Sequence, residues 1–473
     1  MLTLPQEQRR ALWRQLIDRI EHYFETIDQR HVSVPSNPED IRAQLEPLDF
    51  LQPMKPEDAI AFVVDGLWQH QVHTSHARYY GLFNPNPTTM GIAADLLAAA
   101  FNPQLAAWSH NPLACEIEQH LVRQIGLRFG YDANSVAGSF TSGGAEANHT
   151  GLLCALTHTF PSFTDVGLRD IPGQPVLYVS DESHHSFAKA ARLCGIGSEA
   201  VTHIPLNRSH VMDADALVVR IHRDRGEGKV PFFVVATMGT TNAGLLDPLN
   251  EIAEVARRHD LWLHADAAWG GAAAFVPELR PCLGQIERAD SITFDAHKWL
   301  SVPMGAGMFF TRHNDILDRT FGVDTQYMPL AREHPIVEPH RTTMQWSRRF
   351  IGLKVFLSLL VAGWDGYERA LRHQTNMGDL LRDKLEAHDW RVVNHTPLPT
   401  VCFIDALAGA NNSLERLSSI ARQLVDSGKA WLSTTRIGGS VPVLRATITN
   451  YRTQPADLDA LIADLNEARR SVG

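Results

Sequence analysis

The sequence predicts an α/β protein with a mainly parallel central sheet, helices on both faces of it, an N-terminal helical arm and a small C-terminal α+β domain. Three observations lead to this fold class. Short apolar runs alternate with helical patterns from about residue 86 to residue 312, an amphipathic segment precedes them, and a shorter mixed segment follows. Strands and helices in alternation are typical of a parallel sheet that is buried on both faces.

The N-terminal arm is predicted from an amphipathic segment, residues 11–27. Its apolar side chains recur at helical spacing, and they are Trp13, Leu16, Ile17, Ile20, Phe24 and Ile27. Such a face must dock on another surface. Residues 31–60 are rich in proline and polar residues, and residues 81–89 are rich in turn formers, so we place the end of the arm at residue 85.

The large domain is expected over residues 86–365 and the small one over residues 366–473. The expected strands are residues 176–180, 232–236, 261–264, 291–294, 307–310, 401–404 and 443–447, and the expected helices include residues 247–260, 350–362 and 456–470. Parallel sheets bind ligands in the crevice beyond the carboxyl ends of their strands. The polar residues that follow these strands are therefore the candidates for function.

Composition and charge exclude several classes of protein. The 473 residues are 44% apolar and carry a net charge of −10 without a run of Lys or Arg, so we expect a globular protein that does not bind nucleic acid. The longest apolar stretch, residues 350–363, is too short to span a membrane and contains Lys354. The five cysteines form no Cys-x-x-Cys pair, and the N-terminus lacks the apolar core of a signal peptide, which favours a cytoplasmic location.

Two charged residues follow neighbouring strands and indicate a cofactor site. Asp266 ends an apolar run, and a buried carboxylate needs a cation or several hydrogen-bond donors. Lys298 follows the next strand, where a desolvated amine can hold a carbonyl compound covalently. Taken singly, Asp266 also fits a helix cap or a structural ion pair, and Lys298 also fits a solvated surface residue.

Three further motifs follow other strands. Gly144 precedes a helical pattern, where backbone N–H groups and the helix dipole favour a phosphate; the alternative is an ordinary glycine turn. His184 could lie flat on an aromatic ring, although structural polar roles are common for histidine. Thr241 brings a hydroxyl to the same edge, and alone it indicates only a turn. No third ligand accompanies His184 and His185, so no metal is expected.

The order of these motifs is more specific than any one of them. The glycine turn, His184, Thr241, Asp266 and Lys298 each follow a strand of their own. A phosphorylated pyridine aldehyde needs an anion site, a stacking group, a hydroxyl, a counter-ion for its protonated nitrogen and an amine in one crevice. The order therefore predicts pyridoxal 5'-phosphate as the cofactor. Loss of CO₂ leaves an electron pair that such a ring accepts only while a carboxylate keeps its nitrogen charged.

These residues give the sequence its resemblance to the group II pyridoxal-phosphate decarboxylases, the family of aromatic-L-amino-acid, glutamate and diaminobutyrate decarboxylases. The resemblance is strongest over residues 70–365. It implies fold type I, a homodimer in which each arm wraps its neighbour, and decarboxylation of an L-amino acid to its amine and CO₂. It also implies that Lys298 forms the internal aldimine, that Asp266 holds the pyridinium nitrogen, and that His184 stacks on the ring and faces the substrate carboxylate.

The same resemblance assigns the other positions around the cofactor. Gly144 and Ala145 would supply N–H groups to the phosphate, and His297 would adjoin it. Thr241 would lie near the ring hydroxyl, and Ala268 would pack against the ring face. In some relatives Ala145 is replaced by Ser.

Asp295 and Tyr327 carry the least direct assignments. Some relatives have Asn where Asp295 stands, and a carboxylate is an awkward neighbour for a phosphate. The loop of residues 323–328 resembles the family's mobile catalytic loop, whose tyrosine reprotonates the substrate carbon, and Tyr327 matches that tyrosine. A half-buried loop aromatic without a catalytic role is the alternative.

Leu82, Gln104 and Ala106 fall at substrate-pocket positions where aromatic-specific relatives tend to carry Tyr, Ile and Phe. We therefore expect a different substrate side chain, or a roomier pocket, than in a dopa-specific enzyme.

Three other functions stay open. Oxidative decarboxylation to an aldehyde is disfavoured by Tyr327. An aminotransferase could use Arg445 to bind a carboxylate, but His184 does not fit its usual stacking group. A non-enzymatic scaffold would leave Lys298 idle.

Overall fold

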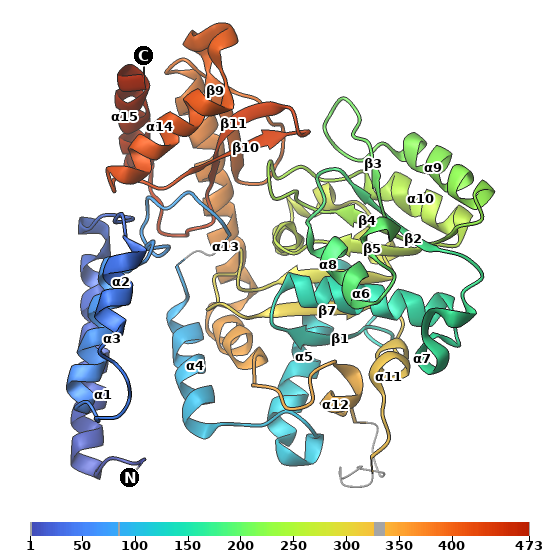
Figure 1. Ribbon diagram of the computed structural model, residues 1–473, viewed down its shortest axis with the longest axis horizontal. Coiled ribbons are helices and arrows are strands. Elements are labelled where there is room, and N and C mark those ends of the chain that lie inside the picture. Colours follow the sequence, from blue (N-terminus) through green and yellow to red (C-terminus); the bar gives the residue numbers. More distant parts are fainter. Residues whose placement is uncertain (1, 84–85, 326–335, 473) are drawn as a thin grey trace.

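A seven-stranded sheet lies at the centre of the computed structural model, which describes residues 2–83, 86–325 and 336–472 (Figure 1). The strand order is β1-β7-β6-β5-β4-β2-β3, and β7 runs antiparallel to β1 and β6 while the other neighbours are parallel. The strands are β1 (Ala137–Thr141), β2 (Pro175–Ser180), β3 (Val201–Ile204), β4 (Val230–Thr237), β5 (Trp262–Asp266), β6 (Ser291–Asp295) and β7 (Gly307–Thr311). The expected mainly parallel sheet is confirmed.

Helices cover both faces of this sheet. On β2, Leu177 and Val179 join one apolar core with α6 and α8, whereas Val176 and Tyr178 join another with α5, α9 and α10. This burial on two faces explains why the strands are continuous apolar runs. The helices of this domain are α4 (Thr89–Phe101), α5 (Pro112–Phe129), α6 (Gly144–Thr159), α7 (Phe163–Val166), α8 (Ser186–Leu193), α9 (Ala214–Gly226), α10 (Leu249–His259), α11 (Ile316–Phe321) and α12 (Pro339–Thr342).

The N-terminal arm stands at one edge of the molecule, away from the large sheet (Figure 1). It contains α1 (Gln6–Thr26), α2 (Pro38–Leu45) and α3 (Pro56–His70). The helix expected at residues 11–27 is confirmed and begins earlier. No residue of these three helices is buried, and Trp13 and Ile17 on α1 keep exposed fractions of 51% and 45%. The single chain therefore leaves part of the apolar face of α1 uncovered.

The C-terminal part adds an antiparallel sheet with its own apolar core. Its strands stand in the order β10-β11-β9-β8, and helices α13, α14 and α15 surround them. The elements are α13 (Gly352–Glu386), β8 (Trp390–Val392), β9 (Thr400–Asp405), α14 (Leu414–Asp426), β10 (Ser433–Ile437), β11 (Val441–Thr447) and α15 (Pro455–Val472). Helix α13 is broken at Gly363, whose φ of 65° lies in the left-handed region that glycine tolerates, and its second half packs on this domain.

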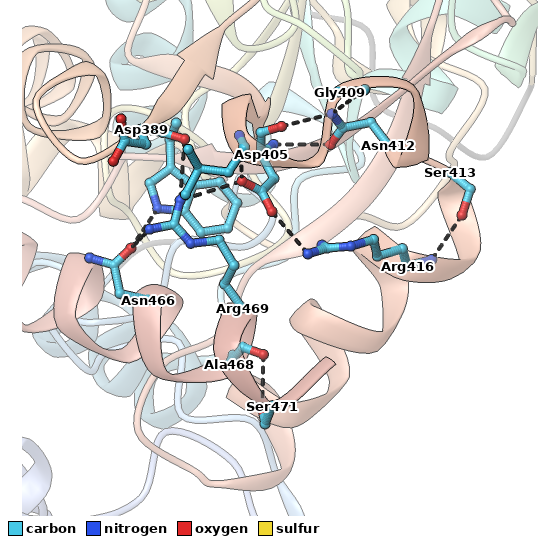
Figure 2. Close-up of polar contacts among 12 residues, drawn as sticks. Asp389, Asp405, Gly409, Asn412, Ser413, Arg416, Asn466, Ala468, Arg469 and Ser471 are labelled. Atoms are coloured by element: carbon cyan, nitrogen blue, oxygen red, sulfur yellow. Dashed lines mark hydrogen bonds and ion pairs between the residues drawn. The ribbon is translucent and has the colours of Figure 1, made fainter. Parts of the chain in front are cut away.

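A buried carboxylate fastens the two outer helices of this domain to its sheet. Asp405, at the end of β9, is fully buried and lies 3.0 Å from Arg416 Nη2 on α14 and 3.4 Å from Arg469 Nη1 on α15 (Figure 2). Asn412 Nδ2 also donates to the Asp405 carbonyl at 2.7 Å, which closes the loop after β9. Two guanidinium groups thus compensate the cost of burying this charge.

All five cysteines carry free thiols. Within the ranges that the structure describes, no helix combines the length and the apolar character that a membrane span requires.

Candidate active site

A small cavity, of about 80 Å³, lies at the carboxyl ends of β4, β5 and β6. Parallel pairing places the ends of these strands together, since Thr237 pairs with Asp266, and Asp266 pairs with Thr293. The cavity is lined by Gly144, Ala145, Asn148, His184, Thr237, Gly239, Thr241, Asp266, Ala268, Trp269, Asp295 and Lys298. The structure therefore brings together every expected cofactor-binding residue except His297.

Lys298 and Asp295 form an ion pair inside this cavity. Lys298 Nζ lies 2.9 Å from Asp295 Oδ2, and the two side chains have exposed fractions of 24% and 2%. The backbone turns tightly after β6, because Lys298 N donates to the Asp295 carbonyl at 3.1 Å. The turn brings both side chains to the same cavity. Asp295 Oδ1 is buried and has no hydrogen-bond partner among the described residues.

Asp266 is held from two sides at the end of β5. Asn148 Nδ2 on α6 donates to its Oδ2 at 3.0 Å, and Ala268 N donates to its Oδ1 at 3.2 Å. The side chain is 5% exposed, so these donors compensate for the water that the carboxylate loses. The result is a fixed negative charge in the same cavity as the Lys298 amine.

His184 follows β2, and its ring has one defined tautomer. Its Nδ1 accepts a hydrogen bond from Ser186 N at 3.2 Å, which leaves Nε2 as the protonated nitrogen of the neutral ring. Burial lowers the pKa of His184 below its usual 6.5, while the Asp266 charge partly opposes this shift. The neutral imidazole is therefore the form at pH 7, with Nε2–H available as a donor.

The start of α6 is suited to an anion. The first N–H groups of a helix, here at Gly144 and Ala145, have no acceptor within the helix, and the helix dipole favours negative charge there. A Cβ on Gly144 would lie 2.8 Å from Asp295 Oδ2, so only glycine leaves room beside this carboxylate. Glu146 is occupied elsewhere, since its Oε2 accepts from Ser142 N at 2.8 Å.

His297 lies behind this cradle. Its Nε2 is 3.9 Å from Asp295 Oδ2, its Nδ1 accepts from Ala306 N at 3.2 Å, and it lines a different cavity, beneath the N-terminal arm. Burial lowers the pKa of His297, with Asp295 opposing the shift. Within one chain, His297 thus lies beside Asp295 but does not itself line the smaller cavity.

The three expected substrate-pocket residues do not line the cavity within one chain. Leu82 and Gln104 are exposed, and Gln104 Nε2 donates to Ser347 Oγ at 3.0 Å. Ala106 is buried, and its carbonyl accepts from His340 N at 3.0 Å. Tyr327 lies outside the described residues.

Arg445 is close to the cavity without lining it. Its guanidinium carbon lies 5.1 Å from the centre of the Phe83 ring, and Lys298 Nζ lies 5.9 Å from the same centre. Phe83 in turn stacks on Trp269, a lining residue, with ring centres 4.6 Å apart. Arg445 therefore belongs to the packing around the cavity.

Sequence reasoning missed four lining residues, which are Asn148, Thr237, Gly239 and Trp269. Trp269 Nε1 donates to the Gly239 carbonyl at 2.8 Å, which joins the loops after β4 and β5. Asn148 closes the glycine-rich motif 140–148, so that motif contained a signal for it. Its amide contacts Asp266 from 118 positions away, which no local pattern reveals.

Comparison with known proteins gives this geometry a family. The sequence pattern described as the "Pyridoxal-dependent decarboxylase conserved domain" matches residues 38–405. The chain belongs to the pyridoxal-dependent decarboxylase family. This decarboxylase is 30% identical to the aromatic-L-amino-acid decarboxylase of Bacillus atrophaeus, over 97% of this chain and 94% of that protein. It is also 28% identical to the L-aspartate decarboxylase dtxS4 of Metarhizium robertsii, over 79% and 76% of the two chains.

Solved structures share the fold of the decarboxylase. The crystal structure of Oryza sativa TDC with PLP and tryptamine superposes with a TM-score of 0.91 at 22% identity, covering 100% of this chain and 99% of that one. The expected family and α/β fold are confirmed. The decarboxylase is a PLP-dependent carboxy-lyase that forms an amine and CO₂ from an amino acid, and the alternative reactions are not favoured.

The residues of the decarboxylase fit pyridoxal phosphate. One cavity offers an amine at Lys298, a fixed carboxylate at Asp266 and a helix N-terminus at Gly144. These groups match the aldehyde, the protonated ring nitrogen and the phosphate of the cofactor. Asp295 fits less well. One of its oxygens is buried without a hydrogen-bond partner among the described residues, and its negative charge would lie next to the phosphate.

Proposed function

We propose that Lys298, Asp266 and His184 carry the decarboxylation chemistry of this enzyme. The supporting observation is that the Lys298 amine and the fixed Asp266 carboxylate share one cavity at the ends of adjacent strands. Lys298 would hold the cofactor aldehyde covalently, and Asp266 would keep the proton on its ring nitrogen. Gly144 and Ala145 bind the phosphate through their N–H groups.

Thr241, Ala268, His297 and Asp295 complete the proposed cofactor site. Thr241 would adjoin the ring hydroxyl of the bound cofactor, and Ala268 would contact its ring; both line the cavity. His297 would act from beside Asp295, because its Nε2 is 3.9 Å from Asp295 Oδ2 and it lines the neighbouring cavity. Asp295 pairs with the Lys298 ammonium group until the lysine reacts.

The chain's own groups divide the work of the reaction. When bound, pyridoxal phosphate supplies a positively charged ring that takes up the electron pair released with CO₂. Lys298 must lose a proton from Nζ before it can bind an aldehyde, and the Asp295 carboxylate, 2.9 Å away, is placed to accept it. The Asn148 and Ala268 donors hold the Asp266 carboxylate in one orientation, so it is in place without reorganisation.

His184 orients the bond that breaks. Its Nδ1 accepts from Ser186 N, so Nε2–H is the group that can donate to the substrate carboxylate. By holding that carboxylate in place, His184 would favour loss of CO₂ over loss of a proton. Tyr327 is proposed to return a proton to the substrate carbon, as the matching loop tyrosine does in the family.

Absorbance of the purified enzyme tests the assignment of Lys298. The wild type is expected to turn yellow with pyridoxal phosphate and to release amine and CO₂ in equal amounts. Lys298→Ala is expected to lose the activity and the absorbance band of the covalent link, because no amine remains for that link; unlinked cofactor has a band of its own and is distinguished from it by wavelength. A Lys298→Ala variant that keeps the band of the covalent link would contradict the assignment of Lys298. Ammonia and peroxide as the main products would contradict amine formation.

We further propose that the preferred substrate is not dopa or tryptophan. Leu82, Gln104 and Ala106 replace large side chains at the expected pocket positions. They lie away from the cavity within one chain, so their role requires a second copy of the chain. Steady-state kinetics over a panel of L-amino acids tests this proposal, and a clear preference for dopa or tryptophan would refute it.

A homodimer is proposed to cover the exposed face of the arm. A second cavity, of about 430 Å³, separates α1 and α3 from the turn after Lys298, and its walls are mainly apolar, including Tyr23, Phe24, Leu67, Trp68, Pro303 and Met304. Together with the exposed Trp13 and Ile17, these walls form a large apolar surface that a monomer would leave in water. A second copy of the chain buries it in our proposal.

Light scattering tests the dimer. The wild type is expected at twice the chain mass, and Ile17→Asp is expected to give monomers because it buries a charge in the interface. Gln8→Asp, a charge added at an exposed polar position of the same helix, is the matched control and should stay dimeric. Monomeric wild-type protein would contradict the proposal.

The domain division and the location remain proposals as well. We propose an arm over residues 1–85, a large domain over 86–365 and a small domain over 366–473; the break of α13 at Gly363 supports the second boundary. Five free thiols support a reducing cytoplasm. Limited proteolysis and cell fractionation test these two proposals.

A further inference from the structure

A chain of buried hydrogen bonds leads from Asp266 into the core beneath the cavity. Asn148 Nδ2 donates to Asp266 Oδ2 at 3.0 Å, and Asn148 Oδ1 lies 3.0 Å from His264 Nε2. His264 Nδ1 lies 2.7 Å from Ser291 Oγ, which accepts from Trp262 Nε1 at 2.8 Å. All five side chains have exposed fractions of 5% or less. We call Trp262, Ser291, His264 and Asn148 the relay, with Asp266 at its end.

The acceptor end fixes the direction of these hydrogen bonds. An ionised Asp266 only accepts, so Asn148 turns its amide nitrogen toward it, and the same nitrogen donates to Ser186 Oγ at 2.9 Å. The amide oxygen therefore faces His264, which requires the proton on Nε2. Burial lowers the pKa of His264 to about 4, so the ring is neutral at pH 7 and its Nδ1 accepts.

The donor end requires the same direction. An indole N–H only donates, so Trp262 occupies a lone pair of Ser291, and the Ser291 hydroxyl is free to donate to His264 Nδ1. Thr293 Oγ1, 3.2 Å from His264 Nε2, is a second acceptor for the same proton and does not reverse the order. Every hydrogen bond of the relay thus points toward Asp266.

The His264 ring is held in this orientation by its packing. It stacks on Phe233 with ring centres 5.6 Å apart and an interplanar angle of 23°. Helix α6 passes so close that a Cβ on Gly151 would lie 2.9 Å from both Cε1 and Nδ1 of the ring. Glycine at this position lets α6 deliver Asn148 to Asp266 while it clamps the histidine.

We propose that Trp262, Ser291 and His264 are positioning residues for the cofactor, which act through the Asn148 amide on Asp266. Aligned hydrogen bonds polarise one another in a dry core, so the relay strengthens the donor that Asp266 receives. It holds the Asp266 carboxylate in the orientation in which it would meet the ring nitrogen of bound pyridoxal phosphate. None of these three residues lines the cavity, and the inference rests on the proposed role of Asp266.

Paired variants of His264 test the relay with readouts that do not depend on turnover. His264→Leu removes the donor to Asn148 Oδ1 and frees the amide to rotate, whereas His264→Gln can keep an N–H near the position of Nε2. The readouts are the Kd for pyridoxal phosphate and the ¹⁵N chemical shift of ring-labelled cofactor, which reports the proton on its nitrogen. The other titratable groups around the cavity, His184, Asp295 and Lys298, are unchanged in both variants.

We expect His264→Leu to raise the Kd about tenfold, equivalent to about 1.4 kcal/mol. Its bound cofactor should lose the ring proton at a pH about one unit lower than in the wild type. His264→Gln should keep the Kd and the ¹⁵N shift close to those of the wild type. Trp262→Phe removes only the donor that starts the relay, and it should change both readouts in the same direction by a smaller amount.

Phe232→Leu is the matched control, because Phe232 is fully buried beside Phe233 on β4 and takes no part in the relay. It should lower the urea midpoint of the apoenzyme and leave both readouts unchanged. Equal changes of the two readouts in His264→Leu and His264→Gln, or an equal change in the control, would overturn the proposal. If His264→Leu fails to fold, unchanged readouts in Trp262→Phe would overturn it. Should Asp266→Asn also bind the cofactor like the wild type, the role of Asp266 itself would be wrong, which is a distinct result.

Discussion

Replacing Asp266 by Asn removes one charge from the active site and little else. The side chain is 5% exposed and is held by Asn148 Nδ2 at 3.0 Å and Ala268 N at 3.2 Å. An amide has nearly the same shape, and its oxygen can still accept from one of these donors. The main loss is the attraction between the carboxylate and a protonated ring nitrogen.

The magnitude follows from Coulomb's law. Two opposite unit charges about 4 Å apart attract each other by about 4 kcal/mol at the effective dielectric constant of about 20 that suits protein sites. If this attraction stabilises the transition state, its loss lowers kcat about a thousandfold. The cofactor Kd should also rise, so kcat must be measured at saturating pyridoxal phosphate.

The assay is release of CO₂ and amine by Asp266→Asn and by a control, Asp224→Asn. Asp224 is also fully buried and accepts from Tyr178 Oη at 3.1 Å, but it lies on α9 and does not line the cavity. The control should lose stability and keep its kcat. A kcat for Asp266→Asn within tenfold of the wild type would refute the electrostatic reasoning.

Three further predictions concern other charges. Asp295→Asn should bind pyridoxal phosphate about tenfold more tightly, because it removes a buried negative charge from the phosphate end of the cavity; weaker binding in an absorbance titration would count against this. Burial lowers the pKa of His184 below 6.5, so protonation of this ring on acidification should reduce kcat/KM only below that pH. A fall of kcat/KM that begins above pH 6.5 and disappears in His184→Gln would disprove this assignment. Asp405→Asn leaves two half-buried arginines without their buried counter-ion, so its free energy of unfolding in urea should fall by about 3 kcal/mol while kcat stays the same; an unchanged urea midpoint would argue against this ion-pair network.

The strands of the large sheet could be predicted because most are buried on both faces. The run at β4 is continuously apolar for this reason. Strand β1 could not be predicted in the same way, since Ala137–Thr141 holds a glycine and two hydroxyl residues and becomes a strand through its pairing with β7. Gly138 is needed there, because a Cβ would lie 2.3 Å from the Phe309 carbonyl oxygen. Helix α13 was expected to end at residue 362 and continues to Glu386, because its polar second half packs on the small domain.

The candidate site shows a similar division. Residues that directly follow strands, such as Asp266 and Lys298, could be placed together because parallel strands end at one edge. Asn148 and His264 could not be placed in this way, because their side-chain contacts join α6, β5 and β6. Asn148 and Asp266, for example, are more than 100 positions apart in the sequence. His297 adjoins Lys298 in sequence, but neighbouring residues point in different directions, and this one lines the cavity under the arm. Tertiary packing alone sets these positions.

The most direct test of the central claim is reduction of the cofactor-loaded enzyme with borohydride, followed by peptide mass spectrometry. Reduction fixes the covalent link between the cofactor and its lysine. We expect a single modified peptide that contains Lys298, and no modified peptide in Lys298→Ala. Cofactor attached to another lysine in the wild type, or to none while the enzyme is active, would contradict the role of Lys298.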